Sequence, residues 1–161
     1  MKKLQQFFTA LVAVLTVFAF GSTTLAQTVD SGKSGAGTIT ISNASQGQTY
    51  TAYKLFDATV TADGSGISYK LPAGKTVANF GGDTWFDVDS KGNVTAKAGA
   101  DLTSAEFKAW AVANGEKIVS AQAEDNTLVF TNVPYGYYYI ESSLGSIITV
   151  DSTKPNVTVI D

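Results

Sequence analysis

The sequence predicts a mainly β protein, a β-sandwich interrupted by one short helix. Short runs of β-branched and aromatic residues recur along the chain, and many alternate with polar residues. Turn-forming clusters such as Asp63–Gly66 and Pro134–Gly136 separate these runs. Only one segment carries a helix-start signal. Together these three observations favour two packed sheets.

The expected strands follow one another at short intervals. In chain order they are Thr38–Ile41, Tyr50–Val60, Ile67–Leu71, Trp85–Val88, Asn93–Ala96, Thr127–Thr131, Tyr137–Glu141, Ser146–Val150 and Asn156–Ile160. The helix is expected after Thr103–Glu106, which reads as a capping box ahead of Phe107–Ala113. Gly115 stands where a helix end favours a left-handed residue. The helical insert is expected to occupy roughly residues 98–123.

The first 26 residues have the three-part layout of a secretory signal peptide. Met1–Lys3 is basic, Phe7–Phe20 is almost wholly apolar, and Gly21–Ala26 supplies small residues before a cut after Ala26. The apolar run has 14 residues, fewer than the roughly 20 that cross a bilayer. We therefore expect a secreted protein that has no membrane contact once the signal is removed. Gln27–Ala36, rich in Gly and Ser, is expected to be a flexible lead-in.

Composition excludes several classes of function. The 161 residues include no cysteine and no histidine, so disulfides, zinc fingers and histidine-dependent catalysis are excluded. All basic residues are lysines, and the net charge of −3 becomes −5 when Lys2 and Lys3 are removed. Acidic surfaces repel phosphate, so no nucleic-acid partner is expected. We expect no cofactor, no metal and no enzymatic turnover.

Three segments resemble one family. They are Gly37–Ala44 with Gly47–Ala58, which includes Tyr-Lys-Leu-Phe-Asp; Leu128–Ser142, which includes Pro-Tyr-Gly-Tyr-Tyr; and Asp151–Asp161. With the signal peptide and the helical insert, they resemble the N-terminal domain of sortase-assembled backbone pilins of streptococci and related Gram-positive bacteria. That domain is an immunoglobulin-like sandwich related to the collagen-adhesin B-type domains. The resemblance covers residues 37–161.

The resemblance implies a structural subunit of a covalent cell-surface pilus, or fimbrium, that supports cell adhesion. Its partners would be neighbouring pilin subunits, sortase during assembly, and host surface ligands; its location would be the cell wall. The competing interpretation is a secreted or tip-located adhesin module that binds a host protein or glycan through loops such as Asp63–Gly66.

The family often forms an internal isopeptide bond, and the resemblance places Lys54 as its lysine and Glu141 as the assisting acid. Such a single-turnover reaction needs a neutral lysine and a protonated acid, and burial favours both. Strand alternation puts Lys54 on a face with Tyr50, Ala52 and Phe56. The alternative is that Lys54 and Glu141 are ordinary solvated residues of strand edges.

The asparagine that would accept this bond is not evident. In the family it lies at the end of the last strand, which here corresponds to one or two residues beyond Asp161. Asn156 stands about five residues too early and is a weak candidate. We therefore expect residues 37–161 to be a domain truncated at its C-terminal end, with the sortase motif and anchor outside the sequence.

Two further groups allow functional interpretations. Asp83, Asp87, Asp89 and Asn93 could suggest a calcium loop, but the EF-hand spacing is missing and a polar hairpin is favoured. The tyrosines between residues 135 and 139 could stack on sugars, but strand alternation favours burial of at least half of them.

Overall fold

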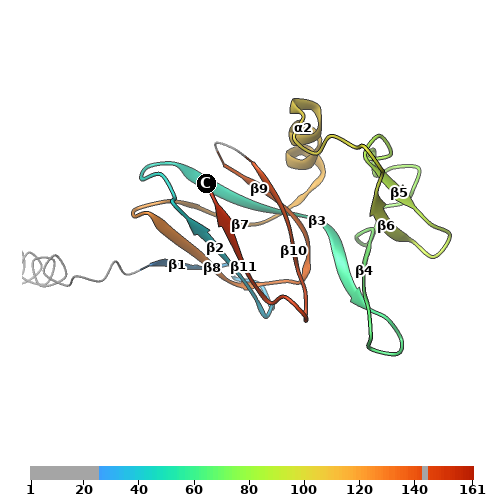
Figure 1. The fold of residues 1–161 in the computed structure, drawn as a ribbon, viewed down its shortest axis with the longest axis horizontal. Coiled ribbons are helices and arrows are strands. Elements are labelled where there is room, and N and C mark those ends of the chain that lie inside the picture. Colours follow the sequence, from blue (N-terminus) through green and yellow to red (C-terminus); the bar gives the residue numbers. More distant parts are fainter. Residues whose placement is uncertain (1–25, 143–144) are drawn as a thin grey trace, which may run out of the picture.

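The computed structural model describes residues 26–142 and 145–161, and it shows a mainly β sandwich (Figure 1). Most of the predicted signal peptide lies outside the described residues. The elements are β1 (Gln27–Asp30), β2 (Gly37–Ser42), β3 (Thr49–Val60), β4 (Ile67–Lys70), β5 (Phe86–Val88), β6 (Asn93–Ala96), α2 (Ala105–Asn114), β7 (Glu116–Gln122), β8 (Thr127–Val133), β9 (Gly136–Glu141), β10 (Ser146–Val150) and β11 (Asn156–Ile160).

The strands form two sheets. The smaller sheet has the order β1-β8-β2-β11, with β2 and β8 antiparallel and both edge strands parallel to their neighbours. The larger sheet has the order β10-β9-β3-β4-β6-β5, and β7 also pairs with β3. Strand β3 has twelve residues, enough to pair with strands in both halves of this sheet. The first half of β3 pairs with β7 and β9, and its second half pairs with β4.

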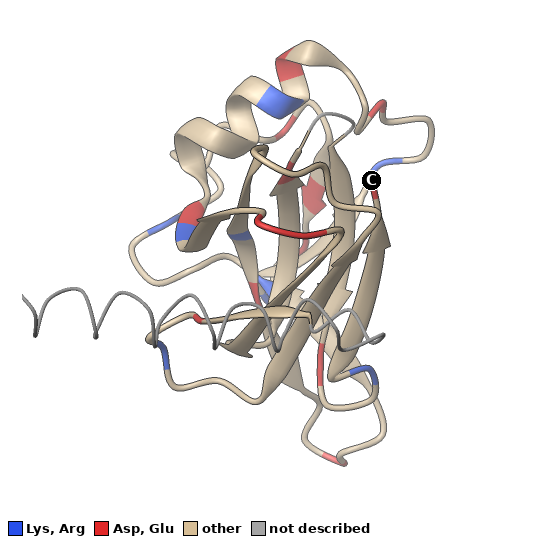
Figure 2. Cartoon of the chain, turned by 90° about the vertical axis from the view of Figure 1, so that its left-hand side faces the viewer, with Lys and Arg blue, Asp and Glu red and all other residues tan. Residues whose placement is uncertain are grey.

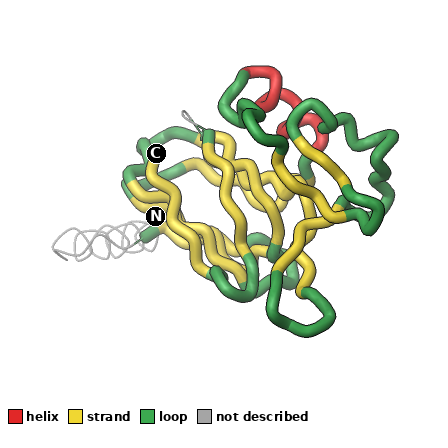
Figure 3. The backbone as a smooth tube through the Cα atoms, turned by 45° about the vertical axis from the view of Figure 1, so that its right-hand side comes forward, coloured by secondary structure: helices red, strands yellow, loops and turns green. Residues whose placement is uncertain are grey.

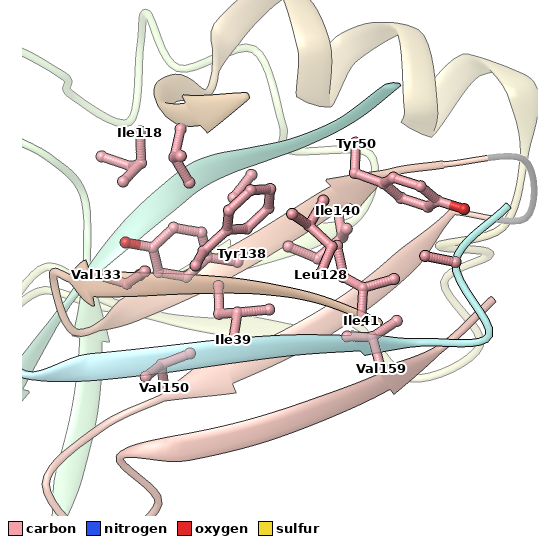
Figure 4. Close-up of a cluster of buried hydrophobic side chains, with 14 of the residues drawn as sticks. Ile39, Ile41, Tyr50, Ile118, Leu128, Val133, Tyr138, Ile140, Val150 and Val159 are labelled. Carbon is pink, nitrogen blue, oxygen red and sulfur yellow. The ribbon is translucent and has the colours of Figure 1, made fainter. Parts of the chain in front are cut away.

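The sandwich core fills the space between the two sheets. Figure 4 shows Ile39, Ile41 and Leu128 of the small sheet pointing toward Tyr138 and Ile140 of the large one. Its buried members are Ile39, Ile41, Ala44, Tyr50, Ala52, Ile118, Val119, Ala123, Leu128, Phe130, Val133, Tyr138, Ile140, Val150 and Val159. The prediction of a β-sandwich with one short helix is therefore confirmed.

A second cluster, the aromatic core, lies on the other face of the large sheet. Its buried members are Leu55, Phe56, Phe80, Phe86, Val94, Phe107, Ala111 and Tyr139, with Trp85 and Trp110 packed against them. Helix α2 covers this face with Phe107 and Ala111. Some of the ring pairs meet edge to face, as in Phe56–Phe86, whose centroids are 4.8 Å apart, and others are tilted, as in Phe86–Trp110. The chain thus has three layers: small sheet, large sheet, and helical insert.

The structure differs from several of the expected elements. Residues 27–30 form β1 and pair with β8, so the prediction of a flexible lead-in is wrong for them. Residues 116–122, expected within the insert, form β7 along β3. Ser104, not Thr103, caps α2 by accepting a hydrogen bond from the Phe107 N–H.

Gly115 also departs from expectation, because its backbone is extended and not left-handed. A side chain there would collide with the Ala111 carbonyl oxygen at 2.7 Å and the Tyr53 Cβ at 2.8 Å. The glycine is therefore required by the close approach of the helix end to β3, and not by a left-handed turn.

The two ends of the described chain lie at the same end of the sandwich (Figure 3). Gln27 pairs with Leu128, and Leu128 in turn pairs with Ile41. Ile41 pairs with Val159 on the far side of β2. The first and last strands therefore occupy opposite edges of one sheet.

Candidate functional site

Lys54 lies in a charged network at the junction of β3, β7 and β9. Its Nζ atom is 2.7 Å from Asp57 Oδ1 and 3.4 Å from Glu116 Oε2, and its side chain is only 13 % exposed. Glu116 also lies 3.6 Å from Lys33 Nζ. Figure 2 shows charged residues on loops, on the helix and on strands; in this network Lys54 and Asp57 belong to β3 and Glu116 to β7.

The network keeps Lys54 protonated. Burial acts to lower the pKa of Lys54, but the hydrogen bond and charge of Asp57, with the charge of Glu116, outweigh it and raise the pKa above its ordinary value. An ammonium group has no free electron pair and is not a nucleophile. Lys54 therefore acts here as the cation of an ion-pair network.

Glycine at position 136 makes room for the lysine stem. A Cβ at Gly136 would lie 2.8 Å from Lys54 Cγ and 2.6 Å from the Phe56 carbonyl oxygen. Lys54 pairs across the sheet with Tyr138, which is fully buried and donates a hydrogen bond to the Pro134 carbonyl at 2.6 Å. Burial, with the nearby charges of Glu116 and Asp57, raises the pKa of Tyr138, so the phenol stays neutral.

Glu141 lies on β9 opposite Thr51 and accepts a hydrogen bond from the Tyr53 hydroxyl at 3.3 Å. It is half-buried. Residues that face each other across an antiparallel pair point to the same side of the sheet. Tyr53 pairs with Tyr139 and contacts the aromatic core, so Glu141 lies on the aromatic side.

Lys54 and Glu141 therefore lie on opposite faces of the large sheet. Lys54 pairs with Tyr138, which belongs to the sandwich core. The residue opposite Lys54, Tyr138, lies three residues before Glu141, a spacing of about 10 Å along β9. Within the described residues, the acids that contact Lys54 are Asp57 and Glu116. The geometry gives no support to Glu141 as the acid that assists Lys54.

The expected face of Lys54 is correct only in part. Tyr50 and Ala52 do belong to the sandwich core, as alternation predicts. The pairing of β3 with β9 slips between Lys54 and Phe56, and Phe56 belongs to the aromatic core on the other side. A bulge of this kind inserts one residue and moves all later side chains to the opposite face.

Asn156 stands at the start of β11, paired with Thr38 in the small sheet, and is exposed. The inward positions of this strand are taken by Val157 and Val159, of which Val159 is buried in the sandwich core. Lys54 belongs to the other sheet. The structure therefore does not bring Asn156 to the lysine, and an acceptor beyond Asp161 stays a prediction.

Two polar anchors of the sandwich were missed from the sequence. The Tyr50 hydroxyl donates to Asp161 Oδ2 at 2.6 Å and accepts from the Ser45 N–H at 2.8 Å. This contact ties the end of β11 to β3, although the two residues stand 111 positions apart. No local pattern could reveal it, because the two partners stand far apart along the chain.

The second anchor is Asp151, which is only 5 % exposed. Its carboxylate accepts from the Tyr69 hydroxyl at 2.9 Å and from the Thr153 and Lys154 N–H groups at 2.8 and 3.0 Å. Burial acts to raise the pKa of Asp151, but these bonds, together with that from the Thr153 hydroxyl, lower it below its ordinary value. The sequence Asp-Ser-Thr was the signal that could have revealed this anchor, because an aspartate in such a sequence commonly accepts hydrogen bonds from the backbone of its own turn.

In the other predicted polar loops, the carboxylates accept hydrogen bonds from residues of the same loop. Asp89 accepts from the Lys91 and Asn93 N–H groups at 2.8 Å each, which favours the hairpin over a calcium loop. Asp63 Oδ1 accepts from Thr61, and from both the backbone and the hydroxyl of Ser65, and these bonds lower its pKa to about 2. Across residues 26–142 and 145–161, no group of acids stands close enough together to hold a metal ion.

The tyrosine run contributes to both cores. Tyr138 is buried in the sandwich core and Tyr139 in the aromatic core, while Tyr137 packs against Phe56 with ring centroids 5.6 Å apart. Burial of at least half the run is therefore confirmed.

Comparison with known proteins gives no family: no family model matches the chain, and no curated protein matches it. In the described part of the chain, no helix is both long and apolar enough to cross a membrane. The chain is thus defined by its fold, a two-sheet sandwich with a helical insert, and by its internal ion-pair and hydrogen-bond anchors.

Proposed function

We propose that this chain is the N-terminal domain of a structural subunit of a covalently assembled pilus on a Gram-positive cell surface, where it supports adhesion. The subunit is linked to its neighbours by sortase and is exported by its signal peptide. The proposal rests on the family resemblance of the three sequence segments and on where the fold uses them.

One observation carries the proposal: the resembling segments form the centre of the sandwich. They supply β2, β3, β8, β9 and β11, and these strands contribute most of the sandwich core. The segments outside them, from β4 to α2, build the aromatic layer on the outer face. A resemblance spread over the strands that supply most of the sandwich core is broader support than one confined to a surface loop.

The domain is also tied together across its length in ways that suit a structural unit. Tyr50 joins β3 to the end of β11, and Asp151 joins the β10–β11 turn to Tyr69 of β4. Heterologous contacts between such units build open filaments. The proposed subunit would serve as a rigid block in the fibre, with chemistry supplied by sortase.

The test is a denaturing gel and mass analysis of protein released enzymatically from the cell wall of the source organism. An antibody raised against residues 37–161 detects the products. We expect a ladder of covalent multimers, which should collapse to single subunits in a strain that lacks sortase. A single free species with the mass of residues 27–161 would refute the pilin proposal and favour the secreted adhesin module.

A further inference from the structure

The outer edge of β11 carries backbone groups without a partner strand, and these begin just past the bridge between Asp151 and Lys154 in the β10–β11 turn. The Thr38 N–H donates to the Pro155 carbonyl at 2.7 Å, and the Asp161 N–H donates to the Ser42 carbonyl at 3.1 Å. Alternate residues of a parallel strand direct both backbone groups to the same neighbour. Val157 and Val159 therefore bond to β2, while Asn156, Thr158 and Ile160 direct their N–H and C=O groups outward.

Nothing in the described part of the chain pairs with these outward groups. β11 is the end strand of its sheet, and none of the hydrogen bonds among residues 26–142 and 145–161 outside the strand ladders reaches the backbone of Asn156, Thr158 or Ile160. The exposed side chains add to the open surface, since Ile160 is 69 % exposed.

This edge also lacks the usual protection. Natural edge strands are commonly blocked by charged residues, bulges or prolines within the strand. The five residues of β11, Asn-Val-Thr-Val-Ile, contain none of these and are mostly β-branched. By contrast, β1 at the other edge of the sheet has four residues and carries the charged Asp30.

We propose that β11 is a self-association surface and that its partner is the β11 of a second copy, paired antiparallel about Thr158. In this register, Asn156 of one copy faces Ile160 of the other and Thr158 faces Thr158. All three outward residues then exchange both N–H···O bonds with the partner strand, as in hydrogen-bonded antiparallel pairs. The two small sheets become one continuous sheet.

Charge selects the antiparallel arrangement. Lys154 precedes the strand, and Asp161, whose carboxylate accepts the hydrogen bond from Tyr50 and adds a negative charge at this end, follows it. Antiparallel pairing brings the lysine end of one strand beside the aspartate end of the other, at both ends of the interface. Parallel pairing would set lysine against lysine and aspartate against aspartate, which is unfavourable. The proposal does not depend on the pilus function and predicts a two-fold dimer of the isolated secreted protein.

The first test is sedimentation velocity of the secreted protein over a concentration series. We expect a reversible monomer–dimer equilibrium. Thr158→Lys sets two like charges opposite each other and should weaken dimerisation at least tenfold. Thr28→Lys, at an exposed site on β1, should leave dimerisation unchanged. Both variants should keep the wild-type unfolding midpoint, because both side chains are exposed.

The second test uses the absence of cysteine from the chain. In the proposed register, the two Thr158 Cα atoms would lie about 5.5 Å apart, within disulfide range. Thr158→Cys should therefore form covalent dimers under oxidised glutathione much faster than Thr28→Cys does. A monomer at every concentration would overturn the proposal. So would equal cross-linking of the two variants, or preferential cross-linking of Thr158→Cys with Thr28→Cys, which would mean pairing of β11 with β1.

Discussion

The sandwich core and the aromatic core differ in the types of residue that form them and in the elements that enclose them. The sandwich core is mostly aliphatic and lies between two hydrogen-bonded sheets. The aromatic core is closed on one side by the large sheet and on the other by a ten-residue helix and its flanking loops. Both share β3 and β9. Residues of β9 alternate between the two cores, whereas the bulge in β3 sends both Leu55 and Phe56 to the aromatic core.

The difference indicates that the two regions have different local stabilities. Hydrogen-bonded sheets enclose the sandwich core on both sides, whereas α2 covers its side of the large sheet with two buried side chains. Regions with fewer buried contacts open more readily. Both tryptophans, Trp85 and Trp110, pack in the aromatic core, so tryptophan fluorescence reports on that region alone.

The largest effect is expected from Phe130→Ala in the sandwich core. Phe130 is fully buried, so its truncation should lower the free energy of unfolding by about 3–5 kcal/mol. Because both sheets enclose the cavity, far-UV circular dichroism and tryptophan fluorescence should lose their signals together at the same, lower denaturant concentration. Phe130→Leu, which keeps most of the volume, should cost much less. A fluorescence transition that stays at the wild-type midpoint would show that the aromatic core does not depend on the sandwich.

Phe107→Ala should have a smaller and more local effect. The ring is fully buried and packs edge to face against Trp85, with centroids 5.5 Å apart. We expect a loss of about 3 kcal/mol, at the lower end of the range for such changes, because the insert loops can relax toward the cavity. Fluorescence should then change at a lower denaturant concentration than circular dichroism does. Val112→Ala, on the exposed side of α2, is the control and should change neither. Coincident transitions in Phe107→Ala would contradict separate stabilities.

Ser104→Ala should destabilise the same region by about 1 kcal/mol. The Ser104 hydroxyl accepts from the Phe107 N–H at 3.1 Å, and its loss leaves a first-turn donor without this partner. The readout is the fluorescence midpoint in denaturant. Thr103→Ala tests the assignment of the cap, because the Thr103 hydroxyl bonds instead to Asp101 at 2.6 Å. A larger loss for Thr103→Ala than for Ser104→Ala would show that the cap is misassigned.

The smallest effect is a pH dependence that originates in the sandwich. The folded pKa of Asp151 lies below its ordinary value, so its ionised form is favoured in the folded state. Its contribution to stability is present above the unfolded pKa of about 3.9 and is lost as pH falls through the folded pKa. Asp151→Asn should therefore lose less stability than wild type between pH 6 and pH 2.5, measured by circular dichroism in denaturant. An unchanged pH profile would show that Asp151 contributes nothing.

Much of the fold could be predicted from local patterns. Asn93–Ala96, Ser146–Val150 and Asn156–Ile160 form strands with the expected bounds, because β-branched runs between turn residues have few other options. The segments that failed lack such patterns. Gln27–Asp30 becomes a strand because β8 offers a free edge, and Glu116–Gln122 because β3 does. Pairing with a neighbouring strand that has a free edge therefore outweighs a weak local preference for another backbone conformation.

The candidate site shows the same division. The sequence correctly placed Lys54 and Glu141 in two central strands, which the structure pairs side by side. It could not place them relative to each other, because the register shift in β3 and the acids that contact Lys54 depend on the partner strands. One of those acids, Glu116, is 62 positions away along the chain.

The sequence by itself determined the class of fold, the central strands and the helix, since these follow from residue type and spacing over a few positions. Only the tertiary structure decided which face each strand residue occupies, that Lys54 is held as a paired cation, and that Tyr50 and Asp151 anchor the last strands. The physical reason is distance along the chain. Hydrogen bonds, ion pairs and pKa shifts act between groups a few ångströms apart in space, and in a sandwich such groups come from segments that the sequence keeps far apart.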